Sequence, residues 1–183
     1  MINRSEPESY FGYNVQYGDN FSLRGVEPED VDLLFKIESD PKSGTIAEFG
    51  APLSRHLLTE YALNYDADPF KSGQLRLIIS LHSDVVGLLD IFDISPRNRT
   101  AEVGIYILPE FRMEGVALHA LEEGAKYCAQ HLGLRSLMAK VLESNDKSHA
   151  LFVKAGYRTV GKLTDWQFFN GTYQSVTIFQ LKL

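Results

Sequence analysis

Between residues 100 and 132, near the middle of the chain, the hydrophobic pattern changes from that of a strand to that of a helix. Thr100–Leu108 is rich in β-branched and aromatic residues, which is typical of a strand. Pro109 ends this strand because proline cannot donate to a β-ladder. After a loop at Pro109–Glu114, small and apolar side chains recur at three- and four-residue spacing, which predicts a helix over Gly115–Leu132.

The rest of the chain predicts six further strands and three further helices. The strands are expected at residues 21–26, 75–81, 85–91, 136–142, 157–169 and 172–183. The helices are expected from Pro28 to a stop at Asp40-Pro41, at 53–65 and at 146–155, with loops or turns at 42–52, 66–73 and 93–99. Asn170-Gly171 between the last two strands is a strong hairpin signal.

This order of elements is β-α-α-β-β-β-α-β-α-β-β. It predicts one α/β (α+β) domain over residues 21–183, with a mixed sheet of about seven strands and about four helices. Residues 1–20 are polar with interspersed aromatic side chains and show no clear period. We expect them to form an N-terminal extension, either loose or laid on the domain or on a partner subunit.

Length and composition are those of an ordinary globular domain. The chain has 183 residues, 44% of them hydrophobic and 23% charged. We expect no membrane span, because no run approaches the roughly 18 apolar residues of a membrane helix. We expect no signal peptide, because no apolar core follows the basic residue Arg4. Cys128 is the only cysteine, which excludes an internal disulfide and a cysteine-rich metal site. A cytoplasmic location follows by default.

The net charge of −6 argues against nucleic acid as a partner, since a phosphate backbone requires clustered Lys and Arg. The charge suits a cationic ligand, and it also suits simple solubility. The histidines are His56, His82, His119, His131 and His149. They lack metal-ligand spacing, so we predict no metal site.

The loop before the central helix has the residues of a phosphate site. A helix N-terminus presents unpaired N–H groups and about half a positive charge. Gly115 allows the backbone to approach a phosphate, Ala117 keeps the first turn uncrowded, and Arg112 can add a charge-assisted contact. An ordinary strand-to-helix turn would have the same short sequence, so the loop needs further support.

Two spaced patterns give that support. Arg112-x-x-Gly115-x-Ala117, together with Asn145-x-x-Ser148-x-x-x-Phe152-x-x-x-Gly156-Tyr157, resembles the cofactor segments of the GCN5-related N-acetyltransferase (GNAT) family. Residues 99–102, 107–111 and 169–173 resemble bacterial spermidine/diamine N-acetyltransferases and ribosomal-protein N-acetyltransferases. The resemblance begins at about Phe21 and continues to the end of the chain.

The resemblance implies a GNAT-like, mostly antiparallel sheet, acetyl-CoA as donor and a small-molecule amine as acceptor. It implies that the backbone of Ile107 and Leu108 pairs with the pantetheine amides, and that Asn145, Ser148 and Phe152 line the channel of the pantetheine arm. The N–H groups that would hold the pyrophosphate belong to six successive residues: Arg112, Met113, Glu114, Gly115, Val116 and Ala117.

The chain departs from the family pattern in two places. Many family members have tyrosine where this chain has Phe152, so the hydroxyl that can protonate the leaving thiolate is missing. Met113 and Glu114 replace glycine and basic residues of the phosphate loop, and a carboxylate there repels pyrophosphate unless it points away.

Acetyl transfer to an amine requires a base and an oxyanion donor. We predict Glu102 as the base, on the strand face shared with Gly104 and Tyr106. The alternative is a surface ion pair between Glu102 and Arg97 or Arg99. Tyr106 is a candidate acid or a packing residue, and a backbone N–H near Leu108 is a candidate oxyanion donor.

The acceptor is not fixed by the sequence. Glu38, Glu48 and Asp68 lie in segments that cover the acceptor site in the family, and could attract a polyamine or be ordinary solvated carboxylates. We favour a polyamine N-acetyltransferase; the alternatives are a protein N-terminal acetyltransferase of the ribosomal-protein type and a degenerate CoA-binding regulatory module. The long final hairpin and the aromatic N-terminus predict a homodimer.

Overall fold

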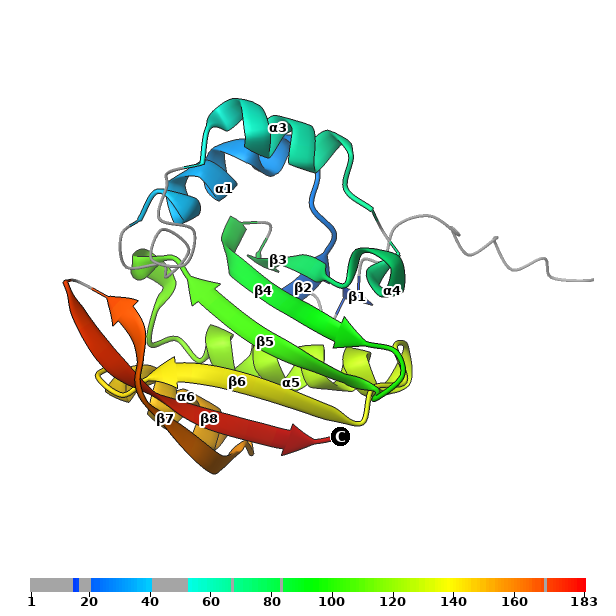
Figure 1. The fold of residues 1–183 in the computed structure, drawn as a ribbon. Helices are drawn as coiled ribbons and strands as arrows, with labels where there is room; N and C mark the ends of the chain where they lie inside the picture. Colours follow the sequence, from blue (N-terminus) through cyan, green and yellow to red (C-terminus); the bar gives the residue numbers. More distant parts are fainter. Residues whose placement is uncertain (1–14, 17–20, 41–52, 67, 83, 170) are drawn as a thin grey trace, which may run out of the picture.

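The computed structural model describes residues 15–16, 21–40, 53–66, 68–82, 84–169 and 171–183. Within them, eight strands form one sheet in the order β1-β2-β3-β4-β5-β6-β8-β7 (Figure 1). The strands are β1 (Val15–Gln16), β2 (Phe21–Arg24), β3 (Leu75–Leu81), β4 (Asp84–Ser95), β5 (Thr100–Ile107), β6 (Ser136–Leu142), β7 (Arg158–Phe169) and β8 (Thr172–Lys182). Among the described strands, only β5 and β6 are parallel neighbours, which confirms a mixed, mostly antiparallel sheet.

Helices cover both faces of the sheet. They are α1 (Val31–Glu38), α3 (Arg55–Leu63), α4 (Pro69–Ser72), α5 (Val116–Gln130) and α6 (Asp146–Lys154), with short 3-10 turns η1 (Pro28–Asp30) and η2 (Pro109–Phe111). The larger core lies between the sheet and α5 and α6, and the smaller core lies between the opposite face and α1 and α3 (Figure 1). No helix in the described part of the chain is long and apolar enough to cross a membrane.

Several predicted ends follow from local chemistry. The side chain of Ser54 caps α3 by accepting a hydrogen bond from the backbone N–H of Leu57, and Asn145 caps α6 in the same way. Gly156 ends α6 with φ +86°, and Gly171 adopts φ +79° in the tight turn between β7 and β8. The hairpin predicted from Asn170-Gly171 is confirmed by the pairing of Phe169 with Thr172.

Two predicted loops and the predicted N-terminal extension contain regular structure. β4 continues to Ser95, because a bulge at Asp93 (φ +49°) carries the strand past polar residues that interrupt its apolar pattern. Asp68 caps α4 by accepting hydrogen bonds from two backbone N–H groups, inside a region predicted as a turn; four residues are too few for a periodic signal. In the predicted N-terminal extension, β1 pairs with β2.

The two parallel strands separate in the middle of the sheet. β5 and β6 pair only at Thr100–Ser136, Ala101–Leu137 and Glu102–Met138. Beyond this point β5 continues alongside β4 alone and β6 alongside β8 alone. We call the opening between residues 103–107 of β5 and 139–142 of β6 the strand wedge; Figure 1 shows the two strands diverging there.

Candidate active site

The edge of β5 along the strand wedge offers backbone hydrogen-bonding groups. Leu108 donates its N–H to the carbonyl oxygen of Val86 at 2.9 Å. Backbone N–H and C=O groups point alternately to the two sides of a strand, so those of Leu108 and of every second residue before it face β4. Those of Val103, Ile105 and Ile107 therefore face the wedge. An extended ligand with amide groups would add to this edge as a strand does.

This alternation corrects one prediction about Leu108. Its N–H already pairs with β4 and its carbonyl oxygen accepts the N–H of Phe111 at 3.0 Å, so Leu108 has no backbone group left to pair with an added strand. The oxyanion donor predicted near Leu108 stays a prediction. Ile107 keeps an N–H toward the wedge, while its carbonyl oxygen accepts a hydrogen bond from Arg112 Nε at 2.8 Å. Sequence reasoning missed Ile105, because the register with β4 decides which residues face the wedge.

Gly115 occupies the N-cap of α5 with φ +82°, a conformation that favours glycine. A Cβ at this position would meet no atom within 4 Å, so the space beside the first turn is open. Met113 and Glu114 are exposed just outside it, and Val116 and Ala117 provide the first helical N–H groups. The predicted phosphate loop is therefore an open helix N-terminus at the end of β5.

Arg112 does not extend into this loop. Besides the hydrogen bond to the Ile107 carbonyl, its guanidinium lies 5.3 Å from the centre of the Tyr106 ring. The predicted phosphate contact of the Arg112 side chain would require it to leave both partners.

The second predicted cofactor segment lies on α6. Asn145 accepts a hydrogen bond from the backbone N–H of Ser148 at 3.1 Å, so the amide oxygen of Asn145 is used as a helix cap. Phe152 is only 4% exposed. Its ring stacks on Phe179 at 5.9 Å and meets Tyr157 edge-on at 5.0 Å, which makes it a core residue at the edge of the site.

A cavity of about 800 Å³ opens where the wedge meets the α1 and α3 face of the sheet. We call it the central cavity. It brings together six of the predicted site residues: Glu38, Glu102, Tyr106, Asn145, Ser148 and Phe152. The base and acceptor candidates thus share one cavity with the α6 part of the cofactor segment.

Glu102 is buried in this cavity and forms an ion pair. Its Oε1 lies 2.8 Å from Nζ of Lys140, and the Glu102 side chain is 11% exposed. An ion pair was one of the two predicted roles, but the partner comes from the parallel strand β6 and not from Arg97 or Arg99. The role of Glu102 as base stays a prediction.

Tyr106 donates its hydroxyl hydrogen to Asp40 Oδ2 at 2.8 Å. Burial and this hydrogen bond raise the pKa of the Tyr106 hydroxyl to about 12. The ring also packs with the smaller core beneath α1 and α3. These contacts favour the predicted packing role of Tyr106 over that of a general acid.

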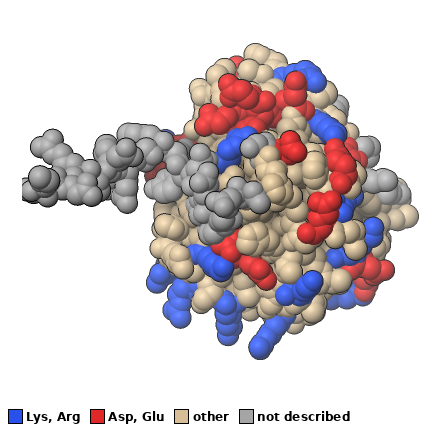
Figure 2. Space-filling view, turned by 180° about the vertical axis from the view of Figure 1, so that it is seen from behind, with Lys and Arg blue, Asp and Glu red and all other residues tan. Residues whose placement is uncertain are grey.

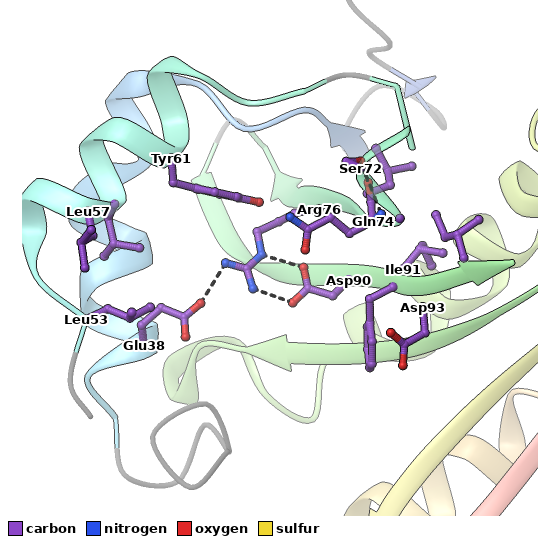
Figure 3. Close-up of a pocket in the computed structure, with 15 residues that line it drawn as sticks. Glu38, Leu53, Leu57, Tyr61, Ser72, Gln74, Arg76, Asp90, Ile91 and Asp93 are labelled. Atoms are coloured by element: carbon purple, nitrogen blue, oxygen red, sulfur yellow. Dashed lines mark hydrogen bonds and ion pairs between the residues drawn. The ribbon is translucent and has the colours of Figure 1, made fainter. Parts of the chain in front are cut away.

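A cluster of three charges joins the central cavity to a side cavity of about 740 Å³ beneath α3 (Figure 3). Arg76 binds both carboxylate oxygens of Asp90, at 2.7 and 2.9 Å, and Oε1 of Glu38 at 2.8 Å. Burial alone would lower the pKa of Arg76, but the two carboxylates raise it. Arg76 is therefore a fixed cation.

Glu38 is thus not the solvated carboxylate that was one of its predicted roles. Its side chain is 3% exposed, and its second oxygen, Oε2, is buried without a hydrogen-bond partner in the described part of the chain. Glu48 lies outside the described residues, and Asp68 serves as the cap of α4. Asp90 was not among the predicted site residues. The signal that could have identified it is a carboxylate inside an otherwise apolar strand.

Surface charge is distributed unevenly. On the face turned away from the view of Figure 1, Asp and Glu gather at the end where α1 and α3 lie, whereas Lys and Arg follow the opposite end (Figure 2). Among the described residues, no group of three or more His, Cys, Asp and Glu side chains is arranged to hold a metal ion.

Comparison with known proteins agrees with this geometry. Residues 20–158 match the family model described as an acetyltransferase (GNAT) domain. The spermidine N(1)-acetyltransferase of Escherichia coli (strain K12) is 25% identical over 161 residues, which cover 86% of this chain and 85% of the relative.

Two solved structures share the fold. One is the spermidine N-acetyltransferase from Vibrio cholerae in complex with CoA and spermine, with a TM-score of 0.78 and 23% identity over 88% of this chain and 95% of that one. The other is a ribosomal L7/L12 alpha-N-protein acetyltransferase in complex with coenzyme A, with a TM-score of 0.81 and 16% identity over 93% of this chain and 98% of that one.

Proposed function

Because the chain belongs to the acetyltransferase (GNAT) domain family and is an acetyl-CoA-dependent N-acetyltransferase, we propose that its acceptor is a primary amine of the polyamine type. The observation that carries this proposal is the charge of the central cavity. Among the residues that the structure describes, four carboxylates line it, those of Glu38, Asp90, Asp93 and Glu102, against two cations, Arg76 and Lys140. The excess of negative charge suits an acceptor with more than one ammonium group.

Glu38 Oε2 is the best-placed group for a distant ammonium of such an acceptor. A buried carboxylate oxygen without a partner is costly, and a ligand ammonium would satisfy it. Trp166, Phe168 and Phe169 of β7 also line the central cavity, and aromatic rings attract alkylammonium groups. The likeness to a spermidine N-acetyltransferase supports the same acceptor class.

We further propose that the strand wedge and the N-terminus of α5 hold acetyl-CoA, which supplies the acetyl group as a thioester. The N–H groups of Ile105 and Ile107 would pair with the pantetheine arm, and those of Gly115, Val116 and Ala117 would hold the pyrophosphate. Ser148 would contact the arm from α6. Glu102 would accept the proton that the amine loses.

A protein N-terminus is the second candidate acceptor. Trp166, Phe168 and Tyr173 are 62%, 56% and 66% exposed near the tip of the β7–β8 hairpin, which would suit a peptide laid across the cavity mouth. The ribosomal L7/L12 acetyltransferase shares the fold. A CoA-binding module without activity is a third candidate, favoured by the absence of a hydroxyl on Phe152.

The experiment that separates these candidates is a CoA-release assay with acetyl-CoA and a panel of spermidine, spermine, a diamine, a monoamine and peptides with free N-termini. We expect turnover with the polyamines and little with the monoamine. Release with peptides alone would exclude the polyamine. CoA binding without turnover on the whole panel would favour the module.

Gly115→Asp should weaken CoA binding by about tenfold or more, because it places a negative charge at the positive end of α5. The matched control is Gly115→Asn, since asparagine also tolerates positive φ and carries no charge. The measurement is the rise in melting temperature caused by CoA, which reports its affinity for the native state. An equal rise in wild type and Gly115→Asp would place the pyrophosphate elsewhere.

We also propose that the protein is a homodimer. β7 is an edge strand of twelve residues with Val160, Trp166 and Phe168 exposed, and a long apolar edge of this kind invites pairing with another strand. Light scattering at micromolar concentration should give twice the mass of 20.6 kDa. A mass of one chain would exclude the dimer under those conditions.

A further inference from the structure

Glu102 and Lys140 meet at the point where the strand wedge opens. Glu102 is the last residue of β5 that pairs with β6, opposite Met138. Lys140 lies two residues further along β6, so its side chain projects from the same sheet face as Met138 and reaches Glu102 at 2.8 Å. Both side chains line the central cavity, and the Lys140 side chain is 41% exposed. The ammonium can therefore change partners without unpacking the core.

The tyrosine hydroxyls near the central cavity are poorly placed to help a leaving thiolate. Phe152 has no hydroxyl, and its ring is held by Tyr157 and Phe179. The Tyr106 hydroxyl already donates to Asp40. Tyr157 has its own hydroxyl buried in the core shared with α5 and α6. Lys140 is the cation that contacts the predicted base.

We propose that Lys140 is a catalytic cation that stabilises the CoA thiolate as it leaves, exchanging its counter-ion Glu102 for the sulfur during acetyl transfer. This inference rests on the proposed function, because it places the thioester at the opening of the strand wedge.

The step balances in atoms and charge. The acceptor ammonium first gives one proton to Glu102, which passes it to water. The neutral amine nitrogen then bonds to the thioester carbonyl carbon, the C–S bond breaks with its electron pair left on sulfur, and Glu102 accepts the second proton that the nitrogen loses. Glu102 becomes neutral as the sulfur becomes negative, so Lys140 always faces one negative charge. The proton then passes from Glu102 to the thiolate or to water, which restores the ion pair.

The exchange can be tested by titrating the thiol of CoA bound to the enzyme in the absence of any acceptor. The ultraviolet absorbance of the thiolate monitors this titration. The free thiol has a pKa of about 8.5. Lys140→Met should raise the pKa of the bound thiol by about one unit, a tenfold change in thiolate, whereas Lys140→Arg should not. Glu102→Gln should lower the pKa below the wild-type value, because Lys140 has then lost its carboxylate.

The matched control is Lys162→Met, which removes a lysine paired with Glu143, outside the residues that line the central cavity. It should leave the pKa of the bound thiol unchanged. In turnover, Lys140→Met should lower kcat with acetyl-CoA by about 10²-fold. The loss should shrink with an acetyl thioester of a nitrothiophenol, whose thiolate needs little stabilisation.

A structural ion pair that only joins β5 to β6 would give a different result. Lys140→Met would then lower the melting temperature and leave the thiol pKa unchanged, which would overturn the inference. If Lys140→Met fails to fold, Glu102→Gln provides the test. A pKa of the thiol bound to Glu102→Gln at or above the wild-type value excludes the exchange. A wild type that binds CoA but acetylates no amine refutes the proposed function, while the thiol titration still tests Lys140.

Discussion

Glu102→Gln should lower kcat/KM at neutral pH by about 10²–10⁴-fold, the usual cost of removing a positioned general base. An aliphatic amine has a pKa near 10.4 and is mostly protonated at neutral pH, so transfer depends on a group that takes its proton. As the pH rises, more of the amine is already neutral. The deficit of the variant should therefore become smaller toward high pH, which a pH profile of kcat/KM measures.

The control for Glu102→Gln is Glu143→Gln. Glu143 also pairs with a lysine, Lys162, but it is 53% exposed and lies outside the central cavity. Its replacement should leave the profile unchanged. If Glu102→Gln has wild-type turnover across the whole pH range, Glu102 is structural and the base must be another group or water.

Arg76→Met should lower the free energy of unfolding by about 3–5 kcal/mol, because it leaves the buried Glu38 and the partly buried Asp90 without their shared counter-ion. Urea unfolding at neutral pH measures this loss.

Arg55→Met is the matched control for Arg76→Met. Arg55 also pairs with a carboxylate, Asp32, but both side chains are exposed, at 56% and 83%. Exposed pairs contribute at most about 1 kcal/mol, so the control should change the stability little. Equal effects of the two substitutions would mean that Arg76 is solvated in solution and that the charge cluster does not form.

The sequence predicted the order of elements and the strand, loop and helix around Gly115 because both depend on local signals. Composition and periodicity identified the strand at Thr100 and the helix after Gly115, and the Asn170-Gly171 turn signal identified the final hairpin. Periodicity also placed Glu102 and Tyr106 on one strand face, and both line the central cavity. These signals require only side-chain spacing and turn chemistry.

The missed contacts depend on which strands become neighbours. Arg97 and Arg99 were the predicted partners of Glu102 because they are close in sequence, whereas Lys140 arrives through the parallel pairing of β5 with β6. Arg76 meets Asp90 through the register of β3 with β4. The N–H of Leu108 is likewise already hydrogen-bonded because Leu108 pairs with Val86 of β4. Spacing within one segment does not determine such registers.

The strand wedge also makes the sheet mechanically uneven. Three residue pairs join the half that contains β1 to β5 to the half that contains β6 to β8, so the backbone hydrogen bonds across this seam are few. Helix α5 contacts β4 and β5 in one half and α6 next to the other half, so side-chain packing also joins the two halves. A ligand arm bound in the wedge would supply hydrogen bonds that β5 and β6 do not make with each other there. Amide protons of Ile105 and Ile107 should then exchange with solvent readily in the empty protein and slowly once the arm is in place.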